Sequence, residues 1–211
     1  MHLPSKRSLA VVLSCWLGLA APAYPQHRGG DPVAMAPELI AGGKGREAKA
    51  LLQPLAIRGD PGAAYWLGRL YYYDVSGIPK NYHRSAYWFA RSAGTGHSGA
   101  QYKLGGMYFS GRGVPKSFSI AATQWRAAAL QRHPEALNNL GALLATGQGV
   151  GRNPELGLVL QILAADMGSE AAQSNVRNKG RQPAAAYMKE LFLTNPAALD
   201  DRLMRVVIDK S

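Results

Sequence analysis

A short glycine-rich segment is the closest match to a chemical motif in this sequence. Gly94-Thr-Gly96-His-Ser-Gly99 fits the pattern GxGxxG, in which closely spaced glycines bring the backbone up to a dinucleotide pyrophosphate. That chemistry requires a β-strand before the glycines, so that the turn presents the phosphates to the N-terminus of the next helix. Here a helical pattern precedes them. We therefore predict a connection between two helices and no cofactor.

The usual residue patterns of serine and metal chemistry are also missing. A β-lactam-type serine enzyme uses Ser-x-x-Lys and Lys-Thr-Gly, and neither string occurs. The histidines show no metal-binding pattern such as His-Glu-x-x-His. They are His2, His27, His83, His97 and His133. We predict no catalytic residues, no metal site and no enzyme activity, with an unrecognised hydrolase as a minor alternative.

The residues best suited to binding a partner lie on one side of a repeated helical pattern. Tryptophan, tyrosine and arginine are frequent hot spots in interfaces. The candidates are Trp66, Arg69 and Tyr73, followed by Lys103 and then Asn139. We predict that they line a groove for an extended peptide or a partner helix. Packing of Trp66 against the helices before it remains an alternative.

A second group of candidate binding residues is basic. Lys80, Lys116 and Arg152 hold one equivalent loop position in three successive units. Stacking of the units would align them as a row of positive charge, which would attract an anionic cell-wall polymer or polysaccharide. A solvated edge without a ligand is the alternative.

A phrase that recurs three times indicates how these side chains are positioned. Its copies begin at Ala63, Ala100 and Ala136, and a shorter fourth copy begins at Ala172, at spacings of 36 to 37 residues. Self-similarity at this period is typical of a stack of small supersecondary units. Each unit would contact mainly its neighbours, so the stack presents a long surface.

Each copy predicts a pair of helices. Apolar residues fall at helical spacing, and a glycine recurs inside the apolar stripe of the first helix. These glycines are Gly68, Gly105 and Gly141. Because a glycine within a helix costs about 1 kcal/mol relative to alanine, we expect a neighbouring helix to approach closely there. Each second helix is preceded by a good N-cap residue, namely Asn81, Ser117 or Asn153.

The ends of the stack depart from this pattern. Residues 46–59 look like a second helix without its partner. The fourth copy has Arg177 where the others have glycine, so close stacking should fail there. From Pro183 onward we expect a C-terminal cap, with a helix over residues 184–193 and another that begins at Pro196.

The first segment is predicted to direct export. Lys6 and Arg7 precede an apolar run, and small residues fit cleavage by signal peptidase after Ala23. The run is about a dozen residues, whereas spanning a bilayer takes about 20, which disfavours a membrane anchor. Lipidation at Cys15, the only cysteine, is a second alternative. Residues 24–43 contain several prolines and glycines and are expected to form a flexible leader.

These patterns resemble the Sel-1-like repeat, a branch of the tetratricopeptide-like α-solenoids. The unit at 100–133 carries Ala-x-x-x-Leu-Gly-x-Met-Tyr and Gly-x-Gly-Val-Pro-Lys, followed by a helix rich in small and aromatic residues. The unit at 63–97 departs from the family in its loop, where Asp74-Val-Ser76 replaces a glycine. The unit at 136–169 has Gly151 in place of the proline.

The resemblance implies an all-α fold, a right-handed α-solenoid of about three to four helix-pair repeats with terminal capping helices. Four segments are expected: a signal peptide (1–23), the flexible leader (24–43), the Sel-1-like solenoid (44–180) and C-terminal capping helices (181–211).

The resemblance also implies an adaptor function. Members generally bind other proteins or peptides, and exported bacterial members are often linked to envelope assembly, secretion or host contact. We therefore expect a non-catalytic protein–protein interaction scaffold, located in the bacterial periplasm or envelope or secreted. The net charge of +11, of which Lys6 and Arg7 contribute two, keeps an anionic glycan open as the other partner. No nucleic-acid-binding module is present in the sequence, so nucleic acid is not expected.

Overall fold

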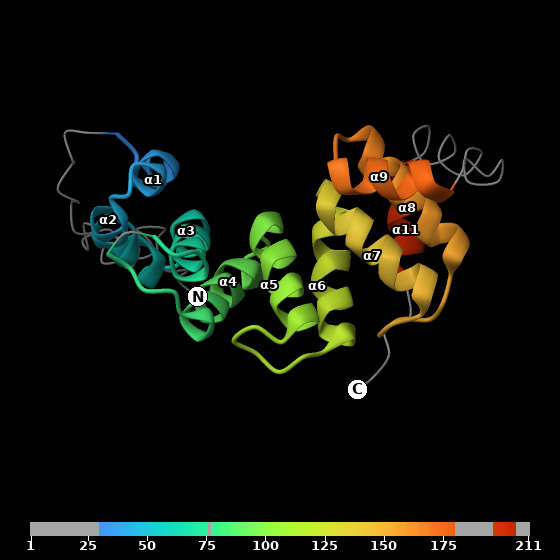
Figure 1. The fold of residues 1–211 in the computed structure, drawn as a ribbon, viewed down its shortest axis with the longest axis horizontal. Helices are drawn as coiled ribbons and strands as arrows, with labels where there is room; N and C mark the ends of the chain where they lie inside the picture. The colour runs from blue at the N-terminus through green and yellow to red at the C-terminus, as the bar shows by residue number, and fades with distance from the viewer. Residues whose placement is uncertain (1–29, 76, 180–195, 206–211) are drawn as a thin grey trace, which may run out of the picture. The chain divides into compact units, whose positions relative to one another are not determined.

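The computed structural model describes residues 30–75, 77–179 and 196–205. Residues 32–211 belong to one compact unit, and the described part of it is built from ten helices that follow one another along the chain (Figure 1). They are α1 (Pro32–Ala41), α2 (Gly45–Ile57), α3 (Pro61–Tyr72), α4 (Tyr82–Gly94), α5 (Ser98–Ser110), α6 (Phe118–Leu130), α7 (Pro134–Thr146), α8 (Pro154–Asp166), α9 (Glu170–Lys179) and α11 (Pro196–Met204).

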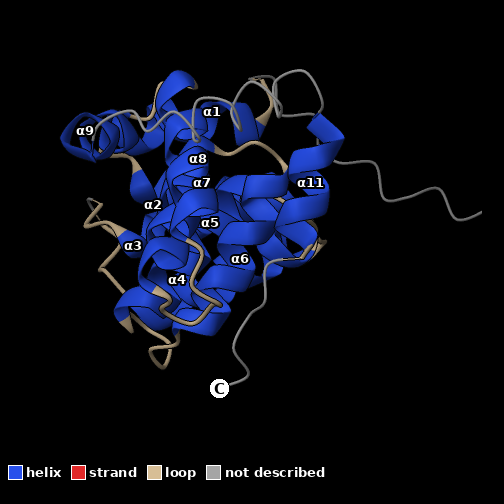
Figure 2. Cartoon of the chain, turned by 90° about the vertical axis from the view of Figure 1, so that its right-hand side faces the viewer, coloured by secondary structure: helices blue, strands red, loops and turns tan. Residues whose placement is uncertain are grey.

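Each helix from α1 to α9 packs against the next, which is the arrangement of an α-solenoid. The three closest pairs are α3 with α4, α5 with α6 and α7 with α8, one pair for each copy of the repeated phrase. Within the described residues no β-strand occurs, and loops join the helices (Figure 2). The predicted all-α solenoid is confirmed.

The helices begin where the sequence places capping residues. The side chains of Asn81, Ser117 and Asn153 each accept a hydrogen bond from the backbone amide three residues later, at 2.9, 3.3 and 3.0 Å. Each bond satisfies an amide that has no partner inside the helix, and such a cap contributes about 1 kcal/mol. The predicted N-caps of α4, α6 and α8 are therefore confirmed.

The glycines inside the first helices are sites of close approach, as expected. A Cβ added to Gly68 would lie 2.5 Å from the ring of Phe89 on α4, and one added to Gly105 would lie 2.6 Å from the indole of Trp125 on α6. At Gly141 the nearest atom is the backbone oxygen of Gly157 on α8, at 2.6 Å. Glycine is thus required in each pair because the partner helix occupies the space of a side chain.

The loop after each first helix reaches back to the preceding unit. Gly113 and Gly149 have φ values of +71° and +67°, a region that other residues rarely adopt. A Cβ on either would also collide with the backbone at the start of the preceding unit's second helix, at Tyr82 or Phe118. In the loop after α7, Val150 is 1% exposed and closes the core. The loops therefore tie neighbouring units together.

The N-terminal end differs from the sequence prediction. Residues 32–41, expected to belong to a flexible leader, form α1, which packs against α2 and α3. Ala36 and Leu39 of α1 are buried in the same apolar cluster as Leu52 and Leu67. The expectation for residues 32–41 was wrong because burial of this apolar face outweighs the helix-breaking tendency of the prolines. The lone helix predicted at 46–59 is confirmed as α2.

At the other end, α9 is the first helix of the fourth copy and packs mainly against α8. The helix that begins at Pro196 is confirmed as α11, but it packs against α6, and its Leu199 and Leu203 enter the core cluster formed by α6–α9. The helix predicted at 184–193 and the signal segment 1–23 lie outside the described residues. Among the described residues, no helix is long and apolar enough to cross a membrane.

Candidate functional site

The candidate binding residues occupy the first helices of successive units. Trp66, Lys103 and Asn139 hold equivalent positions on α3, α5 and α7. Arg69 and Tyr73 follow Trp66 by three and seven residues, a spacing that puts all three on one face of the chain at α3. The repeat therefore fixes where these side chains emerge, while their chemistry differs from unit to unit.

The structure brings four of the predicted residues into one group. The guanidinium carbon of Arg69 lies 4.6 Å from the ring centroid of Trp66 and 5.6 Å from that of Tyr73. Lys103 extends from α5, and its Nζ lies 3.3 Å from the hydroxyl oxygen of Tyr73 and 5.3 Å from the ring centroid of Tyr102. We call Trp66, Arg69, Tyr73, Tyr102 and Lys103 the cation–aromatic cluster. It spans the first two units without a break.

The members of the cluster differ in exposure. Trp66 is partly buried and packs against the apolar cluster of α1–α3, so the alternative predicted for it holds for part of its ring. Tyr73 is 41% exposed. Arg69, Tyr102 and Lys103 are also partly buried, so Tyr73 is the most exposed member of the cluster. Cations over aromatic rings are stabilised by about 0.5–1 kcal/mol at exposed sites.

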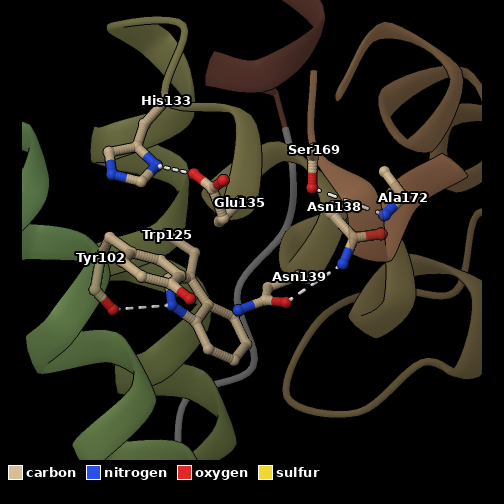
Figure 3. Close-up of polar contacts among 8 residues, drawn as sticks. All are labelled: Tyr102, Trp125, His133, Glu135, Asn138, Asn139, Ser169 and Ala172. Atoms are coloured by element: carbon tan, nitrogen blue, oxygen red, sulfur yellow. Dashed lines mark hydrogen bonds and ion pairs between the residues drawn. The ribbon is translucent and has the colours of Figure 1, made fainter. Parts of the chain in front are cut away.

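Asn139, the fifth predicted groove residue, belongs to a different network. Its side-chain oxygen accepts a hydrogen bond from Asn138 Nδ2 at 3.4 Å (Figure 3). Asn138 Oδ1 in turn accepts one from Asn175 of α9 at 2.9 Å. No described contact connects Asn139 with Lys103. This amide network joins the third unit to α9.

The three basic loop residues are exposed, and each interacts within its own unit. The Nζ atoms of Lys80 and Lys116 lie 5.7 and 4.7 Å from the ring centroids of Tyr82 and Phe118. Arg152 donates a hydrogen bond from Nε to the backbone oxygen of Ala145 at 3.3 Å. A continuous row of charge along this edge stays a prediction.

Arg152 also lines a cavity of about 550 Å³ between the α7–α8 loop and α11. Arg202 and Arg205 of α11 contribute to the same wall, together with Asp201. Arg205 forms an ion pair with Asp201 at 2.8 Å. The arginines outnumber the carboxylate in this lining, so the cavity favours a negatively charged group.

Two tyrosine–histidine stacks form part of the site that sequence reasoning missed. Tyr65 stacks on His97 with ring centroids 4.6 Å apart, and Tyr102 stacks on His133 at 4.7 Å. The tyrosines are equivalent in the first two repeats, and so are the histidines. The sequence could have predicted these stacks from the recurrence of both residues, because two residues that repeat at the same period keep the same relative position in each unit.

The two histidines begin α5 and α7 but make different contacts. His97 Nδ1 accepts a hydrogen bond from the amide of Ala100 at 3.2 Å and so caps α5. His133 does not cap α7, and its Nδ1 lies 3.2 Å from a carboxylate oxygen of Glu135 (Figure 3). Partial burial lowers the pKa of both histidines below the ordinary 6.5, and for His133 this outweighs the opposing effect of Glu135. Both are therefore neutral at pH 7.

The second unit is tied to the cluster by further polar contacts. Trp125 Nε1 donates to the backbone oxygen of Tyr102 at 3.1 Å, which fixes the helix that carries Lys103 (Figure 3). Arg112, in the loop after α5, donates to the hydroxyl of Tyr72 at 2.9 Å. Burial raises the pKa of Tyr102, so its hydroxyl stays protonated at neutral pH. Within the described residues, no group of three or more histidine, cysteine or acidic side chains could hold a metal ion.

Comparison with known proteins agrees with the architecture. A family model for the Sel1 repeat matches residues 61–97, 98–133 and 134–169, just over half of the chain. These segments correspond to the three pairs α3–α4, α5–α6 and α7–α8. No curated protein matches the chain.

Two solved structures are similar to it. One is c5321, a protective antigen present in uropathogenic Escherichia coli strains that displays an SLR fold. It is 32% identical over 58% of this chain with a TM-score of 0.54, and the match spans only 26% of c5321. The other is a Sel1 repeat protein from Oxalobacter formigenes, 29% identical over 56% of this chain and 90% of its own, with a TM-score of 0.53.

Proposed function

Because the chain belongs to the Sel1 repeat family, whose members are generally protein-interaction scaffolds, we propose that it is a non-catalytic scaffold that binds a protein partner through α3 and α5. The observation that supports this most is the cation–aromatic cluster, which joins two units into one surface through Lys103 and Tyr73. An aromatic platform that carries arginine has the composition of an interface hot spot. A partner lying across both units would contact it along the direction of the stack.

Site-specific crosslinking tests this proposal. A photoreactive phenylalanine analogue replaces Tyr73 in the full chain, and the protein is irradiated in an envelope extract of the source cells. The matched control carries the same analogue at Tyr87 on α4, which is 55% exposed, more than Tyr73. We expect a discrete crosslinked protein from position 73 and none from position 87. Equal crosslinking from both positions, or none from position 73, would contradict the proposed surface.

The location in the bacterial periplasm or envelope is part of the same proposal. It rests on Lys6 and Arg7, the apolar run after them and the small residues before the predicted cleavage point at Ala23. Mass spectrometry of the protein recovered from fractionated cells is expected to find Tyr24 as the N-terminal residue in the periplasmic fraction. An intact N-terminus in the cytoplasmic fraction would overturn this part.

A second candidate function is binding of an anionic cell-wall polymer or polysaccharide through Lys80, Lys116 and Arg152. The arginine-lined cavity beside Arg152 favours it, because it offers an open, positively charged recess for an acidic group. Exposed charges are screened within about 10 Å at 0.1 M salt, so this binding should weaken steeply as salt rises. Sedimentation with purified cell wall at low and high salt checks this, and binding that does not change with salt would exclude the basic edge.

A further inference from the structure

The cations of the cation–aromatic cluster differ from the other paired charges of the molecule. The described ion pairs join Arg132 with Asp200 and Arg205 with Asp201, whereas the neutral His133 lies beside Glu135 without an ion pair. Arg69 and Lys103 take part in none of them, and their described contacts are with aromatic rings and a tyrosine hydroxyl. Two positive charges on the face of α3 and α5 thus lack a carboxylate from the described part of the chain.

The geometry leaves the donors of these cations available. The guanidinium of Arg69 lies close to the rings of Trp66 and Tyr73, and its five N–H groups donate to no described acceptor. Lys103 Nζ donates one hydrogen bond, to Tyr73, and an ammonium group has three donors. A guanidinium that is already held by aromatic rings has less conformational freedom left to lose when it binds a partner. The edge of a guanidinium matches a carboxylate through two parallel hydrogen bonds.

From this arrangement we infer that the cluster recognises an acidic segment of the partner protein, with one carboxylate on Arg69 and another on Lys103 and an apolar side chain on the exposed ring of Tyr73. This inference rests on the proposed function, because it names the chemistry of the partner at the same surface. Charge complementarity is the argument for this occupant. The chain is basic overall, with 24 lysines and arginines against 13 acidic residues, so an acidic segment would also be attracted at long range.

The cluster also limits the spacing of the acidic residues. The cationic groups of Arg69 and Lys103 lie 5.6 and 5.8 Å from the same Tyr73 ring centroid, so they are at most about 11 Å apart, which an extended chain covers in about three residues. The segment should therefore carry its two carboxylates two residues apart if extended, because side chains at that spacing point to the same face. In a helix, one turn covers about 5.4 Å, so a spacing of three or four residues fits.

Selection from short random peptides displayed on phage provides the first test. The full chain is the target, and peptides that still bind a Trp66→Ala/Tyr73→Ala variant are removed. We expect the remaining peptides to be enriched in pairs of Asp or Glu at this spacing. Retained peptides without an acidic excess would overturn the inference and leave the proposed function standing. Retention of none would count against both.

A matched pair of variants then measures the contribution of the two charges. A fluorescent peptide from the selection is compared with a copy in which every Asp and Glu is replaced by Asn or Gln. We expect Arg69→Gln/Lys103→Gln to weaken binding of the acidic peptide by at least about tenfold, which corresponds to 1.4 kcal/mol. The control, Lys80→Gln/Lys116→Gln, removes the same net charge from two lysines that also lie over aromatic rings, and should change the affinity much less.

The comparison of the two variants separates local recognition from general attraction. An equal loss in both would show that only net charge matters, and equal binding of the acidic and the neutral peptide would show that carboxylates are not recognised. Either result overturns the inference. Thermal unfolding of both variants is measured alongside, and we expect it to stay close to wild type because none of the four side chains is fully buried.

Discussion

In the first two repeats an aromatic ring covers the glycine of the first helix, whereas in the third repeat two glycines from facing helices meet. Phe89 and Trp125 fill this place in α4 and α6, and the equivalent residue of α8 is Gln161. In α8, Gly157 allows its backbone oxygen to come within reach of Gly141. The recurring glycine therefore contacts a movable side chain in the first two repeats and the backbone of the facing helix in the third.

The first two repeats also differ from the third in the side chains on their outer faces. The first and second repeats present arginine, lysine and tyrosine, while the third repeat has Asn139 in an amide network and a second helix, α8, that is buried along nearly its whole length. The first two repeats are thus suited to contact a partner, and the third forms the packed centre of the largest apolar cluster. This division suggests where substitutions act on binding and where they act on stability.

The largest effect is predicted for the glycine contact of the third repeat. Gly141→Ala would place a Cβ 2.6 Å from the backbone oxygen of Gly157, and a backbone cannot rotate away as a side chain can. We expect a loss of about 3 kcal/mol in the free energy of unfolding, at the upper end of overpacking effects. Gly105→Ala meets the Trp125 ring and should cost less, about 1–2 kcal/mol, because the ring can shift. Urea denaturation of both variants measures the difference.

A neighbouring glycine gives the control for this prediction. Gly106 is also within α5, but a Cβ there would meet nothing within 4 Å. Gly106→Ala should stabilise the protein by up to about 1 kcal/mol, since alanine is the better helix former. If Gly141→Ala destabilised no more than Gly105→Ala, the distinction between side-chain and backbone contact would be wrong.

These positions show what the sequence could predict. The recurring glycines, the N-caps Asn81, Ser117 and Asn153 and the helix order follow from local patterns that repeat, and each was confirmed. Helix α1 was missed because its prolines indicate a loop locally and only contact with α2 and α3 makes the helix favourable. The docking of α11 on α6 was not predicted either, because it also depends on a contact between segments distant in the sequence.

The candidate site was partly accessible to the same reasoning. Helical spacing placed Trp66 and Arg69 on one face of α3, because that depends only on positions within one helix, and Tyr73 follows directly after its last residue. The link to Lys103 and the separation of Asn139 depend on how far one unit is rotated from the next, which a single sequence does not specify. The grouping of the five residues was therefore right in part, and their contacts required the structure.

A second, smaller effect is predicted at the joint between the second and third repeats. Arg132 has a φ of 61° where the other joints have Gly96 and Gly168, and its guanidinium forms an ion pair with Asp200 of α11 at 2.9 Å. A left-handed conformation costs a non-glycine residue roughly 1–2 kcal/mol. A partly exposed ion pair contributes up to about 1 kcal/mol. The joint thus combines strain with a contact that holds the C-terminal helix.

Two substitutions separate these contributions. Arg132→Ala keeps the strain and loses the ion pair, so its free energy of unfolding should fall by up to about 1 kcal/mol. Arg132→Gly loses the pair but relieves the strain, and should be at least as stable as wild type. In both, amide exchange at Leu199 and Leu203 should become faster, because α11 is less firmly held. Equal stability of the two variants would mean that the positive φ carries no strain.

The smallest effect is predicted at the joint between the first and second repeats, and it depends on pH. Partial burial lowers the pKa of His97 below 6.5, despite the opposing charge of Asp60. In the unfolded chain the histidine takes up a proton as the pH falls below 6.5, while in the folded protein Nδ1 keeps accepting from Ala100. The unfolded state then binds more protons, so stability falls with falling pH.

His97→Asn tests this, since asparagine also caps a helix but does not titrate in this range. Between about pH 7.5 and about pH 5.5, the urea midpoint of wild type should fall more than that of the variant. His133, whose pKa is also lowered, remains in both proteins, as do the other histidines, so the variant should still lose some stability. His97→Asn/His133→Asn should lose less again. An identical pH dependence of the urea midpoint in wild type and His97→Asn would show that protonation of His97 does not affect stability. The joints at His97 and His133 would then differ in their contacts but not in their response to pH.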